Sequence, residues 1–201
     1  MKLLLYCTKA KPYLRDYRGK AIYNRFVISP TDRPFTSDDT QPILNGKIVA
    51  ECDFEVEEID TMALSEHVYD DYYNDNIDRI SKESCLTCKQ MCEYLGTTWD
   101  SKGYAIHIKN LHIFDEPRAL DDCEKESKPI FDFTNNYYDD NYYELSHITK
   151  APQNMCKVKL DDKPYILISI RPEWLCKILN SEKIIEVRKK VLKEMLKWLT
   201  E

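Results

Sequence analysis

Three charged residues near the end of the chain have the types and the spacing for chemistry. The segment "SEKIIEVRK" brings Lys183, Glu186 and Arg188 close together in sequence. A lysine beside a carboxylate can act as an acid or a base, and lysine and arginine together suit an anionic ligand such as a phosphate. The alternative is a strand whose alternating charges pair with one another in solvent.

The elements around these charges are predicted by the sequence on either side. Residues 165–170 are apolar and predict a buried strand, and Pro172 begins a helix at a position where its missing amide hydrogen costs nothing. A turn then leads into a second strand over 184–188. Trp174 in the helix either fills the core beneath it or offers a stacking surface for a base.

Strands outnumber helices in the rest of the chain and return after short connections. This pattern indicates an α+β fold built on a small mixed β-barrel with flanking helices. The expected elements are a buried strand over 1–7, a tight Asn45–Gly46 turn followed by a half-buried strand to 59, a helix over 88–95 capped by Thr87, two extended pieces over 103–108 and 111–117 separated by the polar Lys109–Asn110, and a final amphipathic helix over 191–199.

The charge of the chain is unevenly distributed. The formal net charge is −6 over 201 residues, yet residues 1–20 carry +5 and residues 171–201 carry +3. The middle is acidic, with −10 over residues 51–83 and −7 over residues 115–147. A long nucleic-acid track needs many phosphate contacts on a basic surface, so this balance favours a small anionic ligand instead.

The length favours a single domain over 1–201 with insertions near 12–42, 64–80 and 121–146. The last two insertions are rich in Asp, Asn and Tyr without a helical or strand period. They are either solvated surface segments or an acidic docking surface for a protein partner. No apolar run could span a bilayer or form the apolar region of a signal peptide, so we expect a cytoplasmic protein and no membrane partner.

The eight cysteines are expected to be reduced thiols, because several occupy apolar periodic positions. A zinc site is the alternative, with ligands from Cys85, Cys88, Cys92 and one of His67, His107 and His112. Structural zinc sites usually use two Cys-x-x-Cys pairs, and "CLTCKQMC" supplies one. We therefore expect a core-facing helix here, with no metal and no cofactor.

The tail resembles the signature of ASCH-domain proteins, members of the PUA-like superfamily of small β-barrels. That signature is a strand, a short helix and a turn of the form Gly-x-Lys-x-x-Glu-x-Arg that enters the next strand. Lys183, Glu186 and Arg188 fit this spacing, and Ser181 stands at the glycine position. The replacement suggests that the turn does not strictly require a positive φ.

The remaining segments resemble other parts of phage and Firmicute-type ASCH proteins, in the order "LLLYCTKAKPYL", "LNGKIVAECDFEVEEI", "ESCLTCKQMCEYLG", "KGYAIHIKNLHIFDEPRAL" and "ITKAPQNMC". In those proteins the unit found here at 165–190 comes first. The resemblance therefore implies a circularly permuted strand order, with the two termini close together. Pairing of the N-terminal strand with residues 184–188 would test this rearrangement.

The resemblance implies a basic ligand cleft at the tail turn, where the two basic ends of the chain would share one face. Its expected ligand-binding residues are Lys9, Lys11, Arg171, Trp174, Lys183 and Arg188. We expect this cleft to recognise RNA or a nucleotide, including a modified one.

Two alternative functions follow from the same residues. Some small ASCH proteins are amidohydrolases that deacetylate N4-acetylcytidine, which would make Lys183, Glu186 and Glu83 catalytic, although Glu186 stands where those enzymes have a threonine. The other alternative is a phage-type anti-defence or interaction protein that uses the acidic insertions. Between binding and catalysis, we expect binding.

Overall fold

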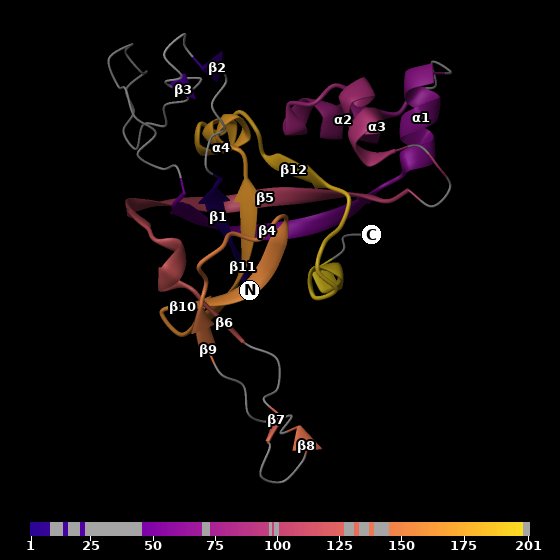
Figure 1. Ribbon diagram of the computed structural model, residues 1–201. Coiled ribbons are helices and arrows are strands. Elements are labelled where there is room, and N and C mark those ends of the chain that lie inside the picture. The colour runs from indigo at the N-terminus through magenta and orange to yellow at the C-terminus, as the bar shows by residue number, and fades with distance from the viewer. Residues whose placement is uncertain are drawn as a thin grey trace. The chain divides into compact units, whose positions relative to one another are not determined.

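The computed structural model in Figure 1 divides into two compact units. It describes residues 1–8, 14–15, 21–22, 46–69, 73–96, 98, 101–126, 131–132, 137–138 and 145–198. Unit 1 comprises Met1–Glu51 and Ile113–Pro172, and unit 2 comprises Cys52–His112 and Glu173–Glu201. Two long strands, β4 (Ile48–Ile59) and β5 (Gly103–Arg118), contribute residues to both units.

The α+β class is confirmed by a mixed sheet and four α-helices within the described residues. The sheet has eight strands in the order β12-β5-β4-β1-β11-β10-β6-β9. Besides β4 and β5, these are β1 (Lys2–Cys7), β6 (Glu124–Glu126), β9 (Leu145–His147), β10 (Met155–Leu160), β11 (Lys163–Ile170) and β12 (Ile185–Arg188). Two short pairs stand outside it, namely β2 (Leu14–Arg15) with β3 (Ala21–Ile22) and β7 (Phe131–Asp132) with β8 (Tyr137–Tyr138).

The predicted barrel is not closed in this structure. Closure requires the first and last strands of a sheet to pair, and the described strands end at β12 and β9 without pairing to each other. The spacing of strands along a sequence gives their number but not their partners, which is why the barrel prediction went too far. The N-terminal strand β1 also pairs with β11, whereas residues 185–188 pair with β5, so the pairing named as a test of the permutation is not found.

Unit 1 is built around two neighbouring buried strands that run parallel. Each residue of β1 pairs with one of β11, from Lys2 with Tyr165 to Cys7 with Ile170. Both strands read as nearly continuous apolar runs because both faces of a central parallel pair are covered. Strand β10 joins β11 through a two-residue hairpin in which Asp161 and Asp162 both have a positive φ, the geometry that matches strand twist.

The hydrophobic core of unit 1 joins these strands to the segments that flank them. Its buried members are Leu4, Tyr6, Ile48, Cys123, Ile148, Val158, Leu160 and Leu167. Several sit next to polar loop residues, so the edge of this core is open to solvent on one side, where the pocket described below lies. All eight cysteines of the chain are in the described part, and no disulfide joins them.

Unit 2 packs three helices, α1 (Thr61–Tyr69), α2 (Asp75–Ser84) and α3 (Cys88–Leu95). The bounds of α3 and its cap at Thr87 are confirmed, and the capping box is completed by Gln90. Helices α1 and α2 occupy much of 64–80, where the sequence showed no period. Their buried apolar residues are Leu64, Ile77 and Ile80, and Thr61 and Ser84 are buried beside them.

Helix α4 (Pro172–Leu179) begins at the predicted proline and ends in a Schellman motif. The Glu182 amide donates to the Lys177 carbonyl at 2.9 Å, and the Ser181 amide donates to the Ile178 carbonyl at 3.0 Å. Ser181 has a φ of 59°, the left-handed conformation that this motif requires. The expectation that the turn needs no positive φ was therefore wrong: the turn keeps the glycine geometry with a serine in it.

The remaining helical segments are short. The chain forms 3₁₀ turns at Leu120–Asp122 and at Met195–Trp198. The second lies where an amphipathic helix over 191–199 was predicted, and within 191–197 Met195 is the fully buried residue. Among the described residues, no helix has the length and apolar character needed to cross a membrane.

Replacing Ser181 by glycine is expected to stabilise the protein by about 0.5–1 kcal/mol, because glycine adopts a positive φ without the steric cost of a Cβ. The measurement is the free energy of unfolding in urea. Asn180→Gly is the matched control: its backbone φ is not positive, so glycine there should destabilise. Equal effects of the two changes would contradict the assignment.

Candidate functional site

Lys183 lies in the turn between α4 and β12 and is almost completely buried, with 2% of its surface exposed. Its Nζ donates a hydrogen bond to the backbone oxygen of Ser84 at 2.7 Å. The same atom lies 3.4 Å from Oε2 of Glu186. The ammonium group is therefore held by a carbonyl and a carboxylate inside unit 2.

The partner carbonyl belongs to the last residue of α2. Carbonyl groups at a helix C-terminus carry partial negative charge, so they stabilise a cation placed against them. Two further contacts fix this helix end to the tail: the Ile184 amide donates to the Glu83 carbonyl at 2.9 Å, and Cys85 Sγ donates to the Glu182 carbonyl at 3.2 Å. The tail turn thus acts as a cap on α2.

Glu186 also binds Arg188, whose guanidinium lies 2.9 Å from its Oε1. Both side chains are about nine-tenths buried, with 11% and 12% exposed. Trp174 completes the group, because Nζ of Lys183 and Nζ of Lys177 each lie 5.3 Å from its ring centroid. The structure therefore brings together four of the predicted site residues, Trp174, Lys183, Glu186 and Arg188, called here the tail cluster.

Burial lowers the pKa of Lys183, and the charge and contact of Glu186 oppose this shift. A lysine in this state can exchange a proton, but only with a group that reaches it. Its contacts with Ser84, Glu186 and Trp174 leave 2% of its surface for such a group. The geometry favours a structural cation that joins α2, α4 and β12 over a phosphate contact.

Glu83, the third candidate catalytic residue, belongs to a separate network. Its carboxylate lies 3.3 Å from Arg79, and Arg79 binds Glu57 at 2.7 Å. Glu57 further accepts from Asn76 at 2.7 Å and lies 2.9 Å from Nε2 of His107. The side chain of Glu83 is thus paired within the described residues to Arg79, not to Lys183 or Glu186.

The other predicted ligand residues are not part of the tail cluster as described. Arg171 is exposed and follows β11 in unit 1. Lys9 and Lys11 lie outside the described residues, as does most of the acidic segment around 127–144. The shared basic face of the two chain ends accordingly stays a prediction.

The three cysteines considered as zinc ligands do not meet. Cys85 Sγ contacts the Glu182 carbonyl, and Cys92 Sγ points inward to the Leu64 carbonyl at 3.7 Å. Cys88 instead lies with His67 and Asp78, with one potential ligand atom from each within 4.8 Å of the others. His107 binds Glu57, as above.

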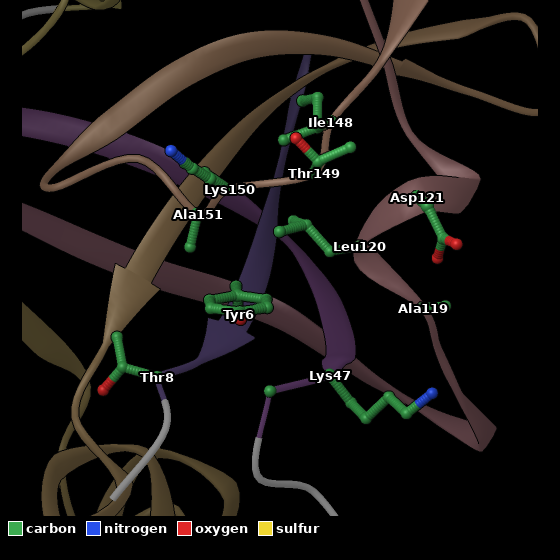
Figure 2. A pocket seen from close by; sticks show the side chains of 11 residues that line it. Tyr6, Thr8, Lys47, Ala119, Leu120, Asp121, Ile148, Thr149, Lys150 and Ala151 are labelled. Atoms are coloured by element: carbon green, nitrogen blue, oxygen red, sulfur yellow. The ribbon is translucent and has the colours of Figure 1, made fainter. Parts of the chain in front are cut away.

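A pocket of about 600 Å³ lies in unit 1, and sequence analysis did not find it. Figure 2 shows its apolar floor, where the ring of Tyr6 lies opposite Leu120, with Lys150 on one side of the view and Lys47 on the other. It is lined by Tyr6, Thr8, Gly46, Lys47, Ala119, Leu120, Asp121, Ile148, Thr149, Lys150 and Ala151 and is called here the unit 1 pocket.

Backbone hydrogen bonds hold two walls of the unit 1 pocket together. The Cys7 amide donates to the Lys47 carbonyl and the Gly46 amide donates to the Cys7 carbonyl, both at 2.9 Å. Gly46 has a φ of 80°, so the turn before β4 depends on glycine. Burial, with a smaller effect of Cys7, raises the pKa of Tyr6, which keeps its hydroxyl neutral at physiological pH.

The two lysines of the unit 1 pocket differ from Lys183 of the tail cluster in exposure and in pairing. Lys150 is exposed and Lys47 is half-buried, and neither has an ion-pair partner in the described part of the chain. They come from loops about a hundred positions apart, whose neighbours Ile48 and Ile148 are buried in the same hydrophobic core. The only local sequence feature that could have pointed to these two lysines was therefore the Gly46 turn beside Lys47.

Replacing Lys183 by methionine is expected to lower the free energy of unfolding by about 3 kcal/mol, since it leaves the buried Ser84 carbonyl without its donor and the Glu186 carboxylate with Arg188 as its remaining cation. Urea unfolding measures the change. Lys177→Met is the control, because Lys177 contacts the same Trp174 ring and should cost less than about 1 kcal/mol. Similar losses in both variants would refute the special role of Lys183.

The contribution of Glu57 to stability is expected to depend on pH. Burial alone raises the pKa of Glu57, but hydrogen bonds from Asn76, Arg79 and His107 and the charge of Arg79 together lower it below its usual 4.5. Its stabilising effect is therefore complete above the unfolded pKa and is lost as the pH falls through the folded pKa. Glu57→Gln should cost about 1–2 kcal/mol at neutral pH, and the difference from wild type should close in acid.

The measurement for Glu57 is urea unfolding across the acid range. Glu55→Gln supplies the control, since Glu55 lies on the same strand, is more exposed and pairs only with Lys109 among the interactions described. Its replacement should leave the acid dependence of wild type unchanged. A difference in unfolding free energy between Glu57→Gln and wild type that persists in acid would show that the carboxylate charge is not what stabilises the fold.

The described residues thus hold a charge-compensated tail cluster in unit 2 and, in unit 1, an open pocket with two lysines that form no ion pair within that part of the chain. Comparison with models of protein families, with curated proteins and with solved structures gives no match. The function is accordingly inferred from the residues of the two sites.

Proposed function

We propose that the protein binds a nucleotide, free or as an unpaired residue of a short RNA, in the unit 1 pocket. The observation that carries this proposal is a pocket with an apolar lining that includes Tyr6 and Leu120 and with Lys47 and Lys150 on opposite sides. Their ammonium groups point away from the Tyr6 ring in Figure 2, and the flexible lysine side chain lets them turn toward a bound phosphate. A nucleotide has the matching parts, because its base is flat and its phosphate is anionic. Stacking on aromatic and apolar side chains and charge-assisted contacts with lysine are the usual means of binding them.

The size of the pocket supports a ligand of this class. A volume of about 600 Å³ lies within the range of roughly 300–1,000 Å³ typical of small-molecule sites. Thr8 and Thr149 line the same pocket and offer hydroxyl groups to a ribose or a base edge. Asp121 adds one acceptor, which suits an amino group or a ribose hydroxyl rather than a phosphate.

The charge of the chain supports a single nucleotide over a long strand. With a net charge of −6, the protein repels a polyanion except where positive charge gathers. Two lysines at one pocket can meet one or two phosphates, whereas non-specific binding to nucleic acid rests on many such contacts. The proposal therefore covers a mononucleotide or the end of a short RNA.

The distant relationship to ASCH proteins is part of this proposal, as an interpretation of the tail motif. Two observations support it: β11, α4 and β12 follow each other in the expected order, and Ser181 adopts the conformation that a glycine at this position would take. In the proposal the tail cluster supports the fold, while the ligand binds in unit 1.

The amidohydrolase alternative has less support. Lys183 and Glu186 are close enough to exchange a proton, but neither lines the unit 1 pocket, and Glu83 pairs with Arg79. A hydrolase needs its acid and base within hydrogen-bond reach of a bound substrate. Binding therefore remains the proposed function.

Replacing both Lys47 and Lys150 by glutamate is expected to weaken binding of nucleoside monophosphates and short RNAs by at least about tenfold, because each lysine–phosphate contact contributes roughly 1–2 kcal/mol. The measurement is calorimetric titration with the four ribonucleoside monophosphates and their free nucleosides. Nucleosides lack the phosphate, so their affinity should change little.

The control for this experiment is Lys163→Glu, an exposed lysine of unit 1 outside the unit 1 pocket. It changes the net charge in the same direction and should leave affinity nearly unchanged. Equal weakening by the control would mean that overall charge, not the pocket, attracts the ligand. No measurable binding of any nucleotide or RNA by the wild-type protein would reject the proposal itself.

A further inference from the structure

We infer that His67, Asp78 and Cys88 form a binding site for a divalent transition metal of the zinc class. One potential ligand atom from each residue lies within 4.8 Å of the other two. The residues come from three helices of unit 2, because His67 is in α1, Asp78 in α2 and Cys88 in α3. This site is independent of the unit 1 pocket.

The donor set selects the metal. An imidazole nitrogen, a thiolate sulfur and a carboxylate oxygen are the three ligand types of zinc, whereas magnesium and calcium take oxygen ligands. In a tetrahedral zinc site the ligand atoms lie roughly 3–4 Å apart, given metal–ligand bonds of about 2.0–2.3 Å. Nε2 of His67 and Oδ1 of Asp78 are already 3.1 Å apart, and the group as a whole, with the Cys88 thiol, lies within 4.8 Å.

Helix capping holds two of the three ligands in place. Asp78 lies in the first turn of α2, which is capped by the Asn74 side chain. Cys88 is the first residue of α3, which is fixed by the capping box of Thr87 and Gln90. A helix N-terminus favours negative charge, so these positions suit a carboxylate and a thiolate.

The helices beneath the site form a packed layer, which limits the movement of its ligands. Leu64 of α1, Ile77 and Ile80 of α2 and Met91 of α3 are buried in one cluster, against which Cys88 also packs. Rigid supporting elements are what a metal site requires. The ligands were thus brought together by the packing of three helices that the sequence did not reveal as neighbours.

The site is partly open to solvent. The side chain of His67 is 16% exposed and that of Asp78 is 44% exposed, so an ion can reach them. A divalent cation with one thiolate and one carboxylate is electrically neutral, which lowers the cost of holding it in a half-buried position. Three protein ligands leave a fourth position for water or a small ligand, as in zinc sites that are not purely structural.

The competing interpretation is a His67–Asp78 ion pair that joins α1 to α2, with Cys88 as a bystander. The two interpretations differ in what Cys88 does, since an ion pair does not need a thiol. Titration of the full-length reduced protein with Co²⁺ tests this, because Co²⁺ replaces Zn²⁺ and reports thiolate coordination by a charge-transfer absorption band. We expect the band to saturate at one equivalent of Co²⁺ and to disappear when Zn²⁺ is added.

Matched cysteine variants decide the outcome. Cys88→Ser should remove the charge-transfer band, and Cys85→Ser, three positions earlier and outside the site, should retain it. Asp78→Asn changes an exposed side chain and should weaken Co²⁺ binding at least tenfold, which provides a second test if Cys88→Ser does not fold. Absence of a band at one equivalent, a band that survives Cys88→Ser, or unchanged affinity in Asp78→Asn would overturn the inference.

Discussion

The ammonium group of Lys183 is the constraint on which the arrangement of unit 2 depends. A buried cation is unfavourable unless each of its interactions is in place, and here those come from three elements: the end of α2, the strand β12 and the ring on α4. Shifting any one of the three would leave a charge in the interior without its partner. The interaction therefore specifies which elements meet, beyond what their apolar faces require.

The same chain uses positive charge in two different ways. In the tail cluster, and at Arg79 and Arg118, cations are bound to carboxylates or carbonyls of the protein itself. At the unit 1 pocket, Lys47 and Lys150 have no such partner among the described residues. For an acidic protein this difference matters, because only cations that are not already neutralised can attract an anionic ligand.

The elements with a clear local pattern could be predicted from the sequence. The apolar run of β1, the alternation in β4, the Thr87 cap and the Pro172 start each follow from a period or a cap of a few residues. Helices α1 and α2 were missed because a run rich in Asp, Asn and Tyr separates them and obscures their period: the buried Leu64 of α1 precedes this run, and the buried Ile77 and Ile80 of α2 follow it. The conformation of Ser181 was predicted wrongly for another reason. A serine in place of glycine suggested a negative φ, but the Schellman hydrogen bonds of Ser181 and Glu182 require a positive φ at this position.

The candidate sites could be predicted far less well, for a physical reason. Lys183, Glu186 and Arg188 are close in sequence, so their contact was expected, but their burial depends on the distant end of α2. The unit 1 pocket and the group formed by His67, Asp78 and Cys88 combine segments that are separated along the chain. Which segments meet depends on strand partners and helix packing, and these are set by the whole fold rather than by local residues.

The parallel pairing of β1 with β11 has a consequence for how the chain reaches its native state. These central strands are far apart in the sequence, so their pairing can form only after residue 170 has been synthesised. Contacts between residues so distant in sequence form late and slowly. Until then β1 can pair with β4 alone, which precedes β11 in the chain, and the edge of β1 that later receives β11 stays open. An open edge between apolar strands is a site where another chain can pair, so the order of synthesis makes this edge the part of the sheet most exposed to aggregation.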